Sequence, residues 1–169
     1  MPIQRLNHAV LYVRDVGRSV AFYTEALGFR VVTEMPGQAA FLQAAASTND
    51  HDLGLFAIGE RAGASTAGRS TVGLYHLAWE VDTLAELQRI RDVLTERGAL
   101  VGASDHGSTK ALYARDPDGI EFEVSWLVPA ALLDPDEKIF TRPLHVEREI
   151  ERYGADTGGG VGVSVPAVR

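Results

Sequence analysis

The chain has 169 residues, 46% of them hydrophobic, a formal net charge of -7 and no cysteine. This length suits one compact domain, and the acidic balance argues against nucleic acid or an anionic membrane as the main partner. The lack of cysteine excludes a disulfide framework, a thiolate metal site and a cysteine nucleophile. Residues 1–11 lack a signal-peptide pattern and no run of about 18 apolar residues occurs, so we expect a cytoplasmic protein.

An internal repeat is the main organisational signal. Residues 6–13 and 74–81 are both apolar, β-prone runs with a histidine at the third position, His8 and His76. Each run is followed by an aspartate and then by a helical pattern. We therefore expect each half of the chain to begin with a strand that carries one of these histidines.

In the first half, a helix is predicted at about residues 17–27, with Gly28 as its C-terminal cap. Three strands are predicted after it, at about residues 29–34, 39–45 and 51–58. Residues 59–71 are rich in Gly, Ala and Ser and are predicted to link the halves. The predicted buried face of the helix consists of Val20, Tyr23, Ala26 and Leu27.

The second half repeats this order. A helix is predicted from Thr83, which forms a capping box with Glu86, to the glycine at position 98. Strands are predicted at about residues 100–104, 109–115 and 120–127, with a turn at residues 116–119. The predicted apolar stripe of the helix consists of Leu84, Leu87, Ile90, Val93 and Leu94.

Each half is thus predicted to be a β-α-β-β-β module, and the fold class to be α+β. We expect one domain at residues 1–128, with modules at about 3–58 and 72–128 that form a curved mixed sheet with the helices outside. Residues 129–169 form a C-terminal extension outside the repeat. A short helix is predicted at residues 144–153, and residues 154–169 have the composition of a flexible tail unless they are held against the body or a neighbour.

The repeated histidines point to a metal site. One histidine in a strand is more often a structural side chain than a ligand, but the same residue at the same place in two halves favours a shared role. Two imidazoles and one carboxylate from the last strand would form a facial triad that leaves positions open for a bidentate substrate and O2. Glu121 and Glu123 nominally share a face, so periodicity does not choose between them.

Residues 116–123 resemble the closing motif of the vicinal oxygen chelate superfamily, and the resemblance extends over about residues 4–127. This superfamily includes glyoxalase I, bleomycin- and fosfomycin-resistance proteins and type I extradiol dioxygenases. The resemblance implies that the metal carboxylate lies four residues after the turn glycine, which is Glu123. It also implies that His8 and His76 are the other two ligands.

Two further segments resemble extradiol dioxygenases. Residues 105–113 resemble the catechol 2,3-dioxygenase segment that carries a histidine and a tyrosine near the substrate, here His106 and Tyr113, although their separation is shorter than in the larger enzymes. Residues 51–56 resemble the stretch with the acid-base histidine, here His51. The resemblance implies that Tyr113 handles a phenolic proton, His106 hydrogen-bonds a substrate oxygen and His51 supplies a proton. The structural alternatives are a loop histidine, a strand-initiating histidine and a core tyrosine.

The resemblance therefore implies an Fe(II)-dependent dioxygenase that opens a catecholic ring with O2. Imidazole also suits Zn and Ni, so a metal-dependent isomerase, epimerase or thiol transferase is the first alternative. A bleomycin-resistance-type binding protein without turnover is the second. We expect a small aromatic substrate, no nucleic acid or membrane partner, and a homo-oligomer, with a homodimer as first choice. The apolar walls of the site are expected to include Val10, Tyr12 and Leu53.

Overall fold

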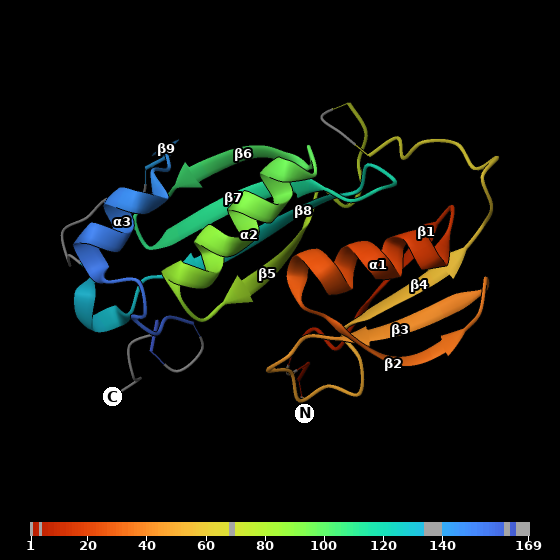
Figure 1. The fold of residues 1–169 in the computed structure, drawn as a ribbon, viewed down its shortest axis with the longest axis horizontal. Helices are drawn as coiled ribbons and strands as arrows, with labels where there is room; N and C mark the ends of the chain where they lie inside the picture. Colours follow the sequence, from red (N-terminus) through yellow and green to blue (C-terminus); the bar gives the residue numbers. More distant parts are fainter. Residues whose placement is uncertain (1, 4, 68–69, 134–139, 161–162, 165–169) are drawn as a thin grey trace. The chain divides into compact units, whose positions relative to one another are not determined.

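The computed structural model describes residues 2–3, 5–67, 70–133, 140–160 and 163–164. The chain divides into two compact units (Figure 1). Unit 1 comprises Met1–Ser65 and Asp116–Gly119, and unit 2 comprises Thr66–Arg115 and Ile120–Arg169. Among the described residues, no helix is both long and apolar enough to cross a membrane.

Unit 1 is a four-stranded mixed sheet with one helix against it (Figure 1). The sheet has the order β1-β4-β3-β2, in which β1 runs parallel to β4 and the other neighbours are antiparallel. The helix α1 packs on β4, β3 and β2. The bounds are β1 Ala9–Val13, α1 Val16–Leu27, β2 Arg30–Met35, β3 Ala39–Gln43 and β4 Leu53–Ala57.

The ends of α1 follow from local side-chain and backbone chemistry. The Asp15 carboxylate accepts a hydrogen bond from the Arg18 backbone N–H at 2.6 Å, which satisfies one of the free donors of the first turn. Gly28 ends the helix at φ 73°, as predicted. The buried face is rotated from the predicted one, since Val20 and Leu27 are only half-buried. It consists of Val16, Ser19, Phe22, Tyr23 and Ala26.

Unit 2 repeats the arrangement and adds a strand. Its sheet has the order β5-β8-β7-β6-β9, again with the first strand of the module parallel to the last, and α2 packs on it (Figure 1). The module contains β5 Leu77–Val81, α2 Leu84–Glu96, β6 Leu100–Asp105, β7 Thr109–Arg115 and β8 Glu121–Leu127. The extension contributes a short 3-10 helix at Ala130–Leu132, β9 Arg142–Pro143 and α3 Val146–Tyr153.

The predicted start of α2 is confirmed in part. The Thr83 hydroxyl accepts from the Glu86 backbone N–H at 3.2 Å, as in a capping box. The Glu86 side chain pairs instead with Arg89, with 2.6 Å between Oε1 and Nη2. The buried stripe matches the prediction except for the half-buried Val93, and consists of Leu84, Leu87, Ile90 and Leu94.

Two β-α-β-β-β modules and the α+β class are thus confirmed. The first strand of each module is shorter than predicted, because its ladder begins at Ala9 and Leu77. His8 and His76 therefore lie immediately before their strands, not within them. The packing of the two modules into one curved sheet stays a prediction.

The turn between β7 and β8 belongs to unit 1. As predicted, residues 116–119 form a turn that ends on Gly119 at φ 84°. The Asp118 carboxylate binds Arg14 Nη1 at 2.7 Å, and Asp116 accepts a hydrogen bond from the buried Tyr23 hydroxyl at 3.2 Å. Burial, followed by the charge of Asp116, raises the pKa of Tyr23 well above its ordinary value. The turn is thereby fixed to α1 through Tyr23 and to the segment between β1 and α1 through Arg14.

Of the two possibilities left open for residues 154–169, a flexible tail or a segment held against the body, the residues described there show the second. The backbone N–H of Gly159 donates to Asp82 O at 2.8 Å, and Trp126 Nε1 donates to Thr157 O at 3.2 Å. A Cβ at Gly159 would collide with the Leu127 carbonyl oxygen, so glycine permits this close approach. Residues 161–162 and 165–169 of the predicted tail lie outside the described residues.

Candidate functional site

Unit 2 brings His76 and Glu123 together. His76 immediately precedes β5, and Glu123 lies on the adjacent β8, opposite Ala78. His76 Nε2 lies 3.3 Å from Glu123 Oε2, and their side chains are 24% and 13% exposed. The other ring nitrogen, His76 Nδ1, is buried without a hydrogen-bond partner among the described residues. An imidazole nitrogen and a carboxylate oxygen that converge in this way are a fitting donor pair for a divalent metal.

The same unit separates the two glutamates that the sequence left equivalent. Glu121 faces Arg115 across the β7–β8 ladder, with 3.7 Å between its Oε2 and Arg115 Nη2. Glu123 faces Tyr113 and approaches His76. Between these two carboxylates, Glu123 is thus the one that meets a histidine.

Tyr113 and His106 extend the cluster. The Tyr113 hydroxyl lies 3.1 Å from His106 Nε2, and the ring centroids of Tyr113 and His76 are 5.9 Å apart. Burial, followed by the negative charge of Glu123, raises the pKa of Tyr113 to about 12. The phenol is therefore protonated at neutral pH and can act as a hydrogen-bond donor. A cation bound at Glu123 would offset the second of these causes.

Unit 1 brings His8 and His51 together. Their ring centroids are 4.4 Å apart. His8 Nδ1 lies 2.7 Å from the side-chain oxygen of Asn7, and because this oxygen only accepts, the Nδ1 carries the hydrogen and Nε2 keeps its lone pair for a ligand role. His51 Nδ1 lies 3.3 Å from the Asp50 carboxylate, whose pKa is lowered, first by the hydrogen bond from the His51 backbone N–H.

The loop that leads into His51 is held by Asp52, which the sequence analysis did not single out. Its carboxylate accepts hydrogen bonds from Ser47 Oγ and Asn49 Nδ2, both at 2.7 Å, and from the Ala44 N–H at 2.8 Å. Asn49 Nδ2 also donates to the backbone oxygen of Asn7 at 2.7 Å. The segments before β1 and before β4 are thus tied together. The cluster of Asn, Asp and Ser around position 50 is typical of a self-bonded turn and could have indicated this.

The open face of the unit 1 sheet is aromatic. The Phe41 ring meets His51 edge-on at 5.1 Å between centroids, and the opposite strand presents Gly54. The expected wall residue Val10 lies on this side, since a Cβ on Gly54 would be 3.4 Å from its methyl group. The expectation for Leu53 is wrong. Its side chain has no exposed surface, because alternation along β4 turns it into the core instead.

The predicted site residues therefore form two clusters. Unit 2 gathers His76, Glu123, Tyr113 and His106, and unit 1 gathers His8 and His51. Within the described part of each unit, no group of three or more His, Asp or Glu side chains is assembled that could hold a metal ion. The complete triad of His8, His76 and Glu123 stays a prediction, and two of its members are neighbours.

The chain is similar in sequence to proteins of known family. Residues 5–124 match the model of the Glyoxalase/Bleomycin resistance protein/Dioxygenase superfamily. The chain belongs to this superfamily. It is 33% identical over 120 residues to a catechol-2,3-dioxygenase of Bacillus subtilis, a match that covers 70% of this chain but only 40% of that relative's length. It is 31% identical over 127 residues to a lactoylglutathione lyase of Salmonella typhimurium, covering 71% of this chain and 90% of the lyase.

Solved structures agree on the fold. A glyoxylase/bleomycin resistance protein/dioxygenase domain from Frankia sp. EAN1pec superposes with a TM-score of 0.61 over 76% of this chain and 96% of that domain. The two sequences are 21% identical, so the likeness concerns the fold alone. The predicted vicinal oxygen chelate fold is confirmed.

Proposed function

We propose that the protein is an Fe(II)-dependent extradiol dioxygenase that opens a catecholic ring with O2. The carrying observation is the hydrogen-bonded pair of Tyr113 and His106 beside His76 and Glu123. A metal-bound substrate with two adjacent oxygens needs such groups to handle its phenolic protons, whereas metal binding alone does not. The similarity to a catechol-2,3-dioxygenase supports the same class of reaction.

The proposed metal ligands are His8, His76 and Glu123. Bound there, Fe(II) would supply open coordination positions for the diol and for O2. His76 Nε2 and Glu123 Oε2 already converge, and the contact of His8 Nδ1 with Asn7 leaves its Nε2 free to bind. Because His8 belongs to unit 1 and the other two to unit 2, we propose that both units contribute to one catalytic domain.

Each remaining side chain has a proposed role. Tyr113, a neutral phenol, donates a hydrogen bond to the deprotonated catechol oxygen. His106 orients the Tyr113 hydroxyl through its Nε2. His51, beside Asp50, holds and then delivers a proton during ring opening. The half-buried rings of Phe41 and His51 contribute an aromatic surface for the flat substrate.

The test is O2 uptake by the protein reconstituted with Fe(II) without air, against a panel of catechols. We expect O2 consumption with at least one catechol and the appearance of a ring-opened product. The Glu123→Ala protein, treated identically, should consume none. No O2 uptake with any catechol, combined with full Fe(II) binding, would contradict the proposal.

A second candidate is a glyoxalase-like enzyme that uses a metal without redox chemistry. It is favoured by the lactoylglutathione lyase of Salmonella typhimurium, of which this chain matches 90%. Protein loaded with Zn, Ni or Mn would then act as an isomerase, epimerase or thiol transferase with no use of O2. A binding protein of the bleomycin-resistance type would hold an aromatic compound tightly and leave it unchanged.

We also propose a homodimer. Val10 and Tyr12, two large side chains on one face of the edge strand β1, are 52% and 70% exposed and form a candidate contact surface. If one chain's His8 serves the partner's His76, mixing His8→Ala with His76→Ala chains should restore metal binding. Random pairing predicts about one quarter of the wild-type metal, because each mixed dimer would hold one intact site of two. No restoration would place all three ligands in one chain.

A further inference from the structure

A network of hydrogen bonds connects the C-terminal extension to the candidate site. Thr141 Oγ1 lies 3.1 Å from His106 Nδ1, and His106 Nε2 lies 3.1 Å from the Tyr113 hydroxyl. Tyr113 in turn faces Glu123 across the β7–β8 ladder, and the pKa of Tyr113 is raised first by burial, then by the charge of Glu123 and by a hydrogen bond to it. Thr141 lies beyond residues 5–124, the part of the chain that matches the superfamily. The outermost residue of this hydrogen-bond network thus lies in the C-terminal extension.

The direction of each hydrogen bond follows from counting hydrogens. Without substrate, the Glu123 carboxylate beside Tyr113 only accepts, so the phenol hydrogen of Tyr113 points to it. The Tyr113 oxygen must then accept from an Nε2–H of His106. A neutral imidazole carries one hydrogen, which leaves Nδ1 with a lone pair that accepts from the Thr141 hydroxyl.

We propose that Thr141 is a positioning residue that selects the Nε2–H tautomer of His106 and directs that hydrogen to Tyr113. Without the Thr141 hydroxyl, the Nδ1–H tautomer becomes accessible. Its Nε2 lone pair then competes with Glu123 for the single hydrogen of Tyr113. The consequence for turnover rests on the function proposed above, whereas the tautomer itself does not.

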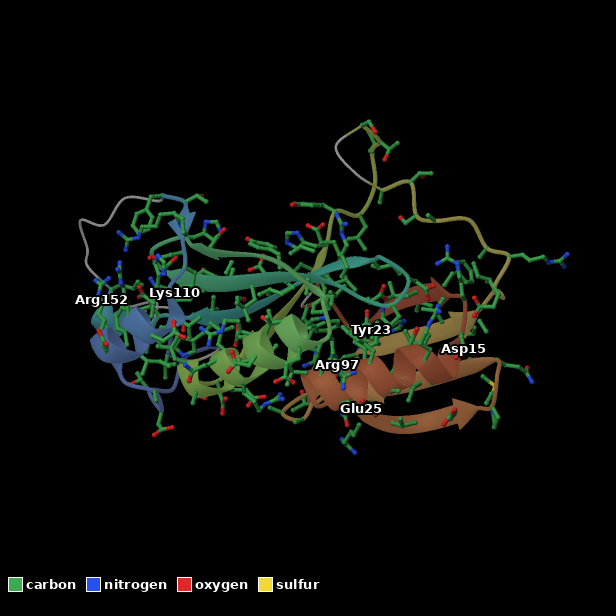
Figure 2. All side chains as sticks on the ribbon, turned by 45° about the horizontal axis from the view of Figure 1, so that its top comes forward. Asp15, Tyr23, Glu25, Arg97, Lys110 and Arg152 are labelled. Carbon is green, nitrogen blue, oxygen red and sulfur yellow. The ribbon has the colours of Figure 1, made fainter. Side chains whose placement is uncertain are left out.

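The extension is held firmly enough for this role. Arg142, the neighbour of Thr141, pairs with Asp105 in the β6–β9 ladder, with 2.8 Å between Nη2 and Oδ2. Asp105 also binds the fully buried Lys110 at 2.5 Å, and Lys110 Nζ lies 3.1 Å from Glu149 on α3. Figure 2 shows Lys110 beside the C-terminal helix, drawn in blue. Because Asp105 immediately precedes His106, one buried ionic cluster positions both partners of the Thr141–His106 hydrogen bond.

The Thr141–His106 contact itself lies at the surface, so its removal should leave the fold intact. The first measurement is 15N NMR of the histidine side chains at a pH where they are neutral, on the full chain without metal and loaded with Zn. The chain has five histidines, and a His106→Gln variant assigns the signal of interest. Wild type should show the Nε2–H tautomer of His106.

Three variants decide the proposal. Thr141→Val should give mixed tautomers at His106, and Thr141→Ser, which keeps the hydroxyl, should restore the wild-type pattern. Thr157→Val is the matched control, because the Thr157 hydroxyl donates to the Tyr153 carbonyl and, among the described residues, has no hydrogen bond to His106. A wild-type tautomer in Thr141→Val, or an equal change in Thr157→Val, would overturn the proposal.

Turnover gives the second readout. With the catechol that wild type cleaves best, Thr141→Val should lower kcat/KM about tenfold, the lower limit of what outer hydrogen-bond partners contribute at metal sites. Thr141→Ser should recover it. A changed tautomer with unchanged kcat/KM would limit Thr141 to a structural role. If no catechol is turned over by wild type, the proposed function fails, and the NMR result still decides whether Thr141 selects the tautomer.

Discussion

At equivalent ladder positions, the two modules carry opposite kinds of side chain. Val10, two residues after His8, pairs with Gly54, whereas Ala78, two residues after His76, pairs with Glu123. One strand further, Gly54 faces Phe41 and Glu123 faces Tyr113. The repeat therefore keeps a histidine in both modules but a carboxylate and a phenol in only one. The other module has no side chain at the first position and an apolar ring at the second.

The two modules of the repeat therefore contribute different chemistry to the proposed site. The ladder partners Ala78, Glu123 and Tyr113, here called the polar row, supply charge and a hydrogen-bond donor. The equivalent partners Val10, Gly54 and Phe41, the Phe41 row, leave open space and an aromatic surface. The edges differ as well. In unit 2, β9 adds to β6, whereas β2 at the corresponding edge of unit 1 has all six residues exposed. The extension thus supports the module that carries the polar row.

The largest expected effect is loss of metal from the polar row. Glu123→Ala and His76→Ala should each abolish Fe(II) binding almost completely, because a facial triad tolerates no missing ligand. His8→Ala should do the same if unit 1 contributes its histidine. Metal content after dialysis is the measurement. Glu121→Ala is the matched control and should keep its metal. Retention in Glu123→Ala with loss in Glu121→Ala would show that the wrong carboxylate was chosen.

Next in size is the effect of the second histidine of unit 1. His51→Ala should bind metal and catechol as wild type does, but turnover should fall by about 10²–10⁴-fold, the range for a positioned acid-base group. His145→Ala serves as the control, since His145 is exposed at the start of α3 and its side chain makes no capping hydrogen bond. Anaerobic catechol titration and aerobic turnover separate binding from chemistry. Wild-type turnover by His51→Ala would make His51 a structural residue.

Removal of the phenol hydroxyl should have a smaller effect. Tyr113→Phe makes the polar row resemble the Phe41 row, and it should weaken anaerobic catechol binding roughly ten- to a hundredfold, since a hydrogen bond to a charged oxygen is worth about 1.5–3 kcal/mol. Tyr153→Phe on α3 controls for the loss of a phenol elsewhere in unit 2. Unchanged catechol affinity in Tyr113→Phe would contradict the proposed contact with substrate.

The smallest expected effect is the pH dependence of the extension's docking. Burial raises the pKa of Asp105, but hydrogen bonds from Lys110, Gly107 and Arg142 outweigh it and the pKa lies below its ordinary value. Such a carboxyl stabilises the fold fully above its unfolded-state pKa of about 3.9, and this stabilisation is lost as the pH falls through the lowered value. We therefore expect release of the extension only in acid below about pH 4.

Tryptophan fluorescence can follow that release. The Trp126 ring packs 5.5 Å from Tyr153 of α3, and a Trp79→Phe background isolates its signal. In this background, Asp105→Asn should be less stable at neutral pH and should lose the acid dependence that the carboxylate supplies. Identical acid transitions with and without Asp105→Asn would show that the ionic cluster does not hold the extension.

Much of the fold was decided by local patterns. The apolar spacing of the two helices, the cap at Gly28, the turn at residues 116–119 and the strand alternation act over a few residues, and each predicted its element closely. The repeated histidine also predicted that His8 and His76 hold equivalent positions, and both directly precede the first strand of their module. Interactions of short range can be inferred from sequence because the neighbours are known in advance.

Other features depended on the tertiary structure. The contact between His76 and Glu123 joins residues that are far apart in the chain, and only the ladder register separates Glu123 from Glu121. The same register opposed Gly54 to Phe41 and turned Leu53 into the core. Likewise, no pattern in the sequence of the extension predicted that Thr141 meets His106 or that Arg142 pairs with Asp105. Strand pairing and ion-pair partners are chosen by the free energy of the whole fold, which no local pattern contains.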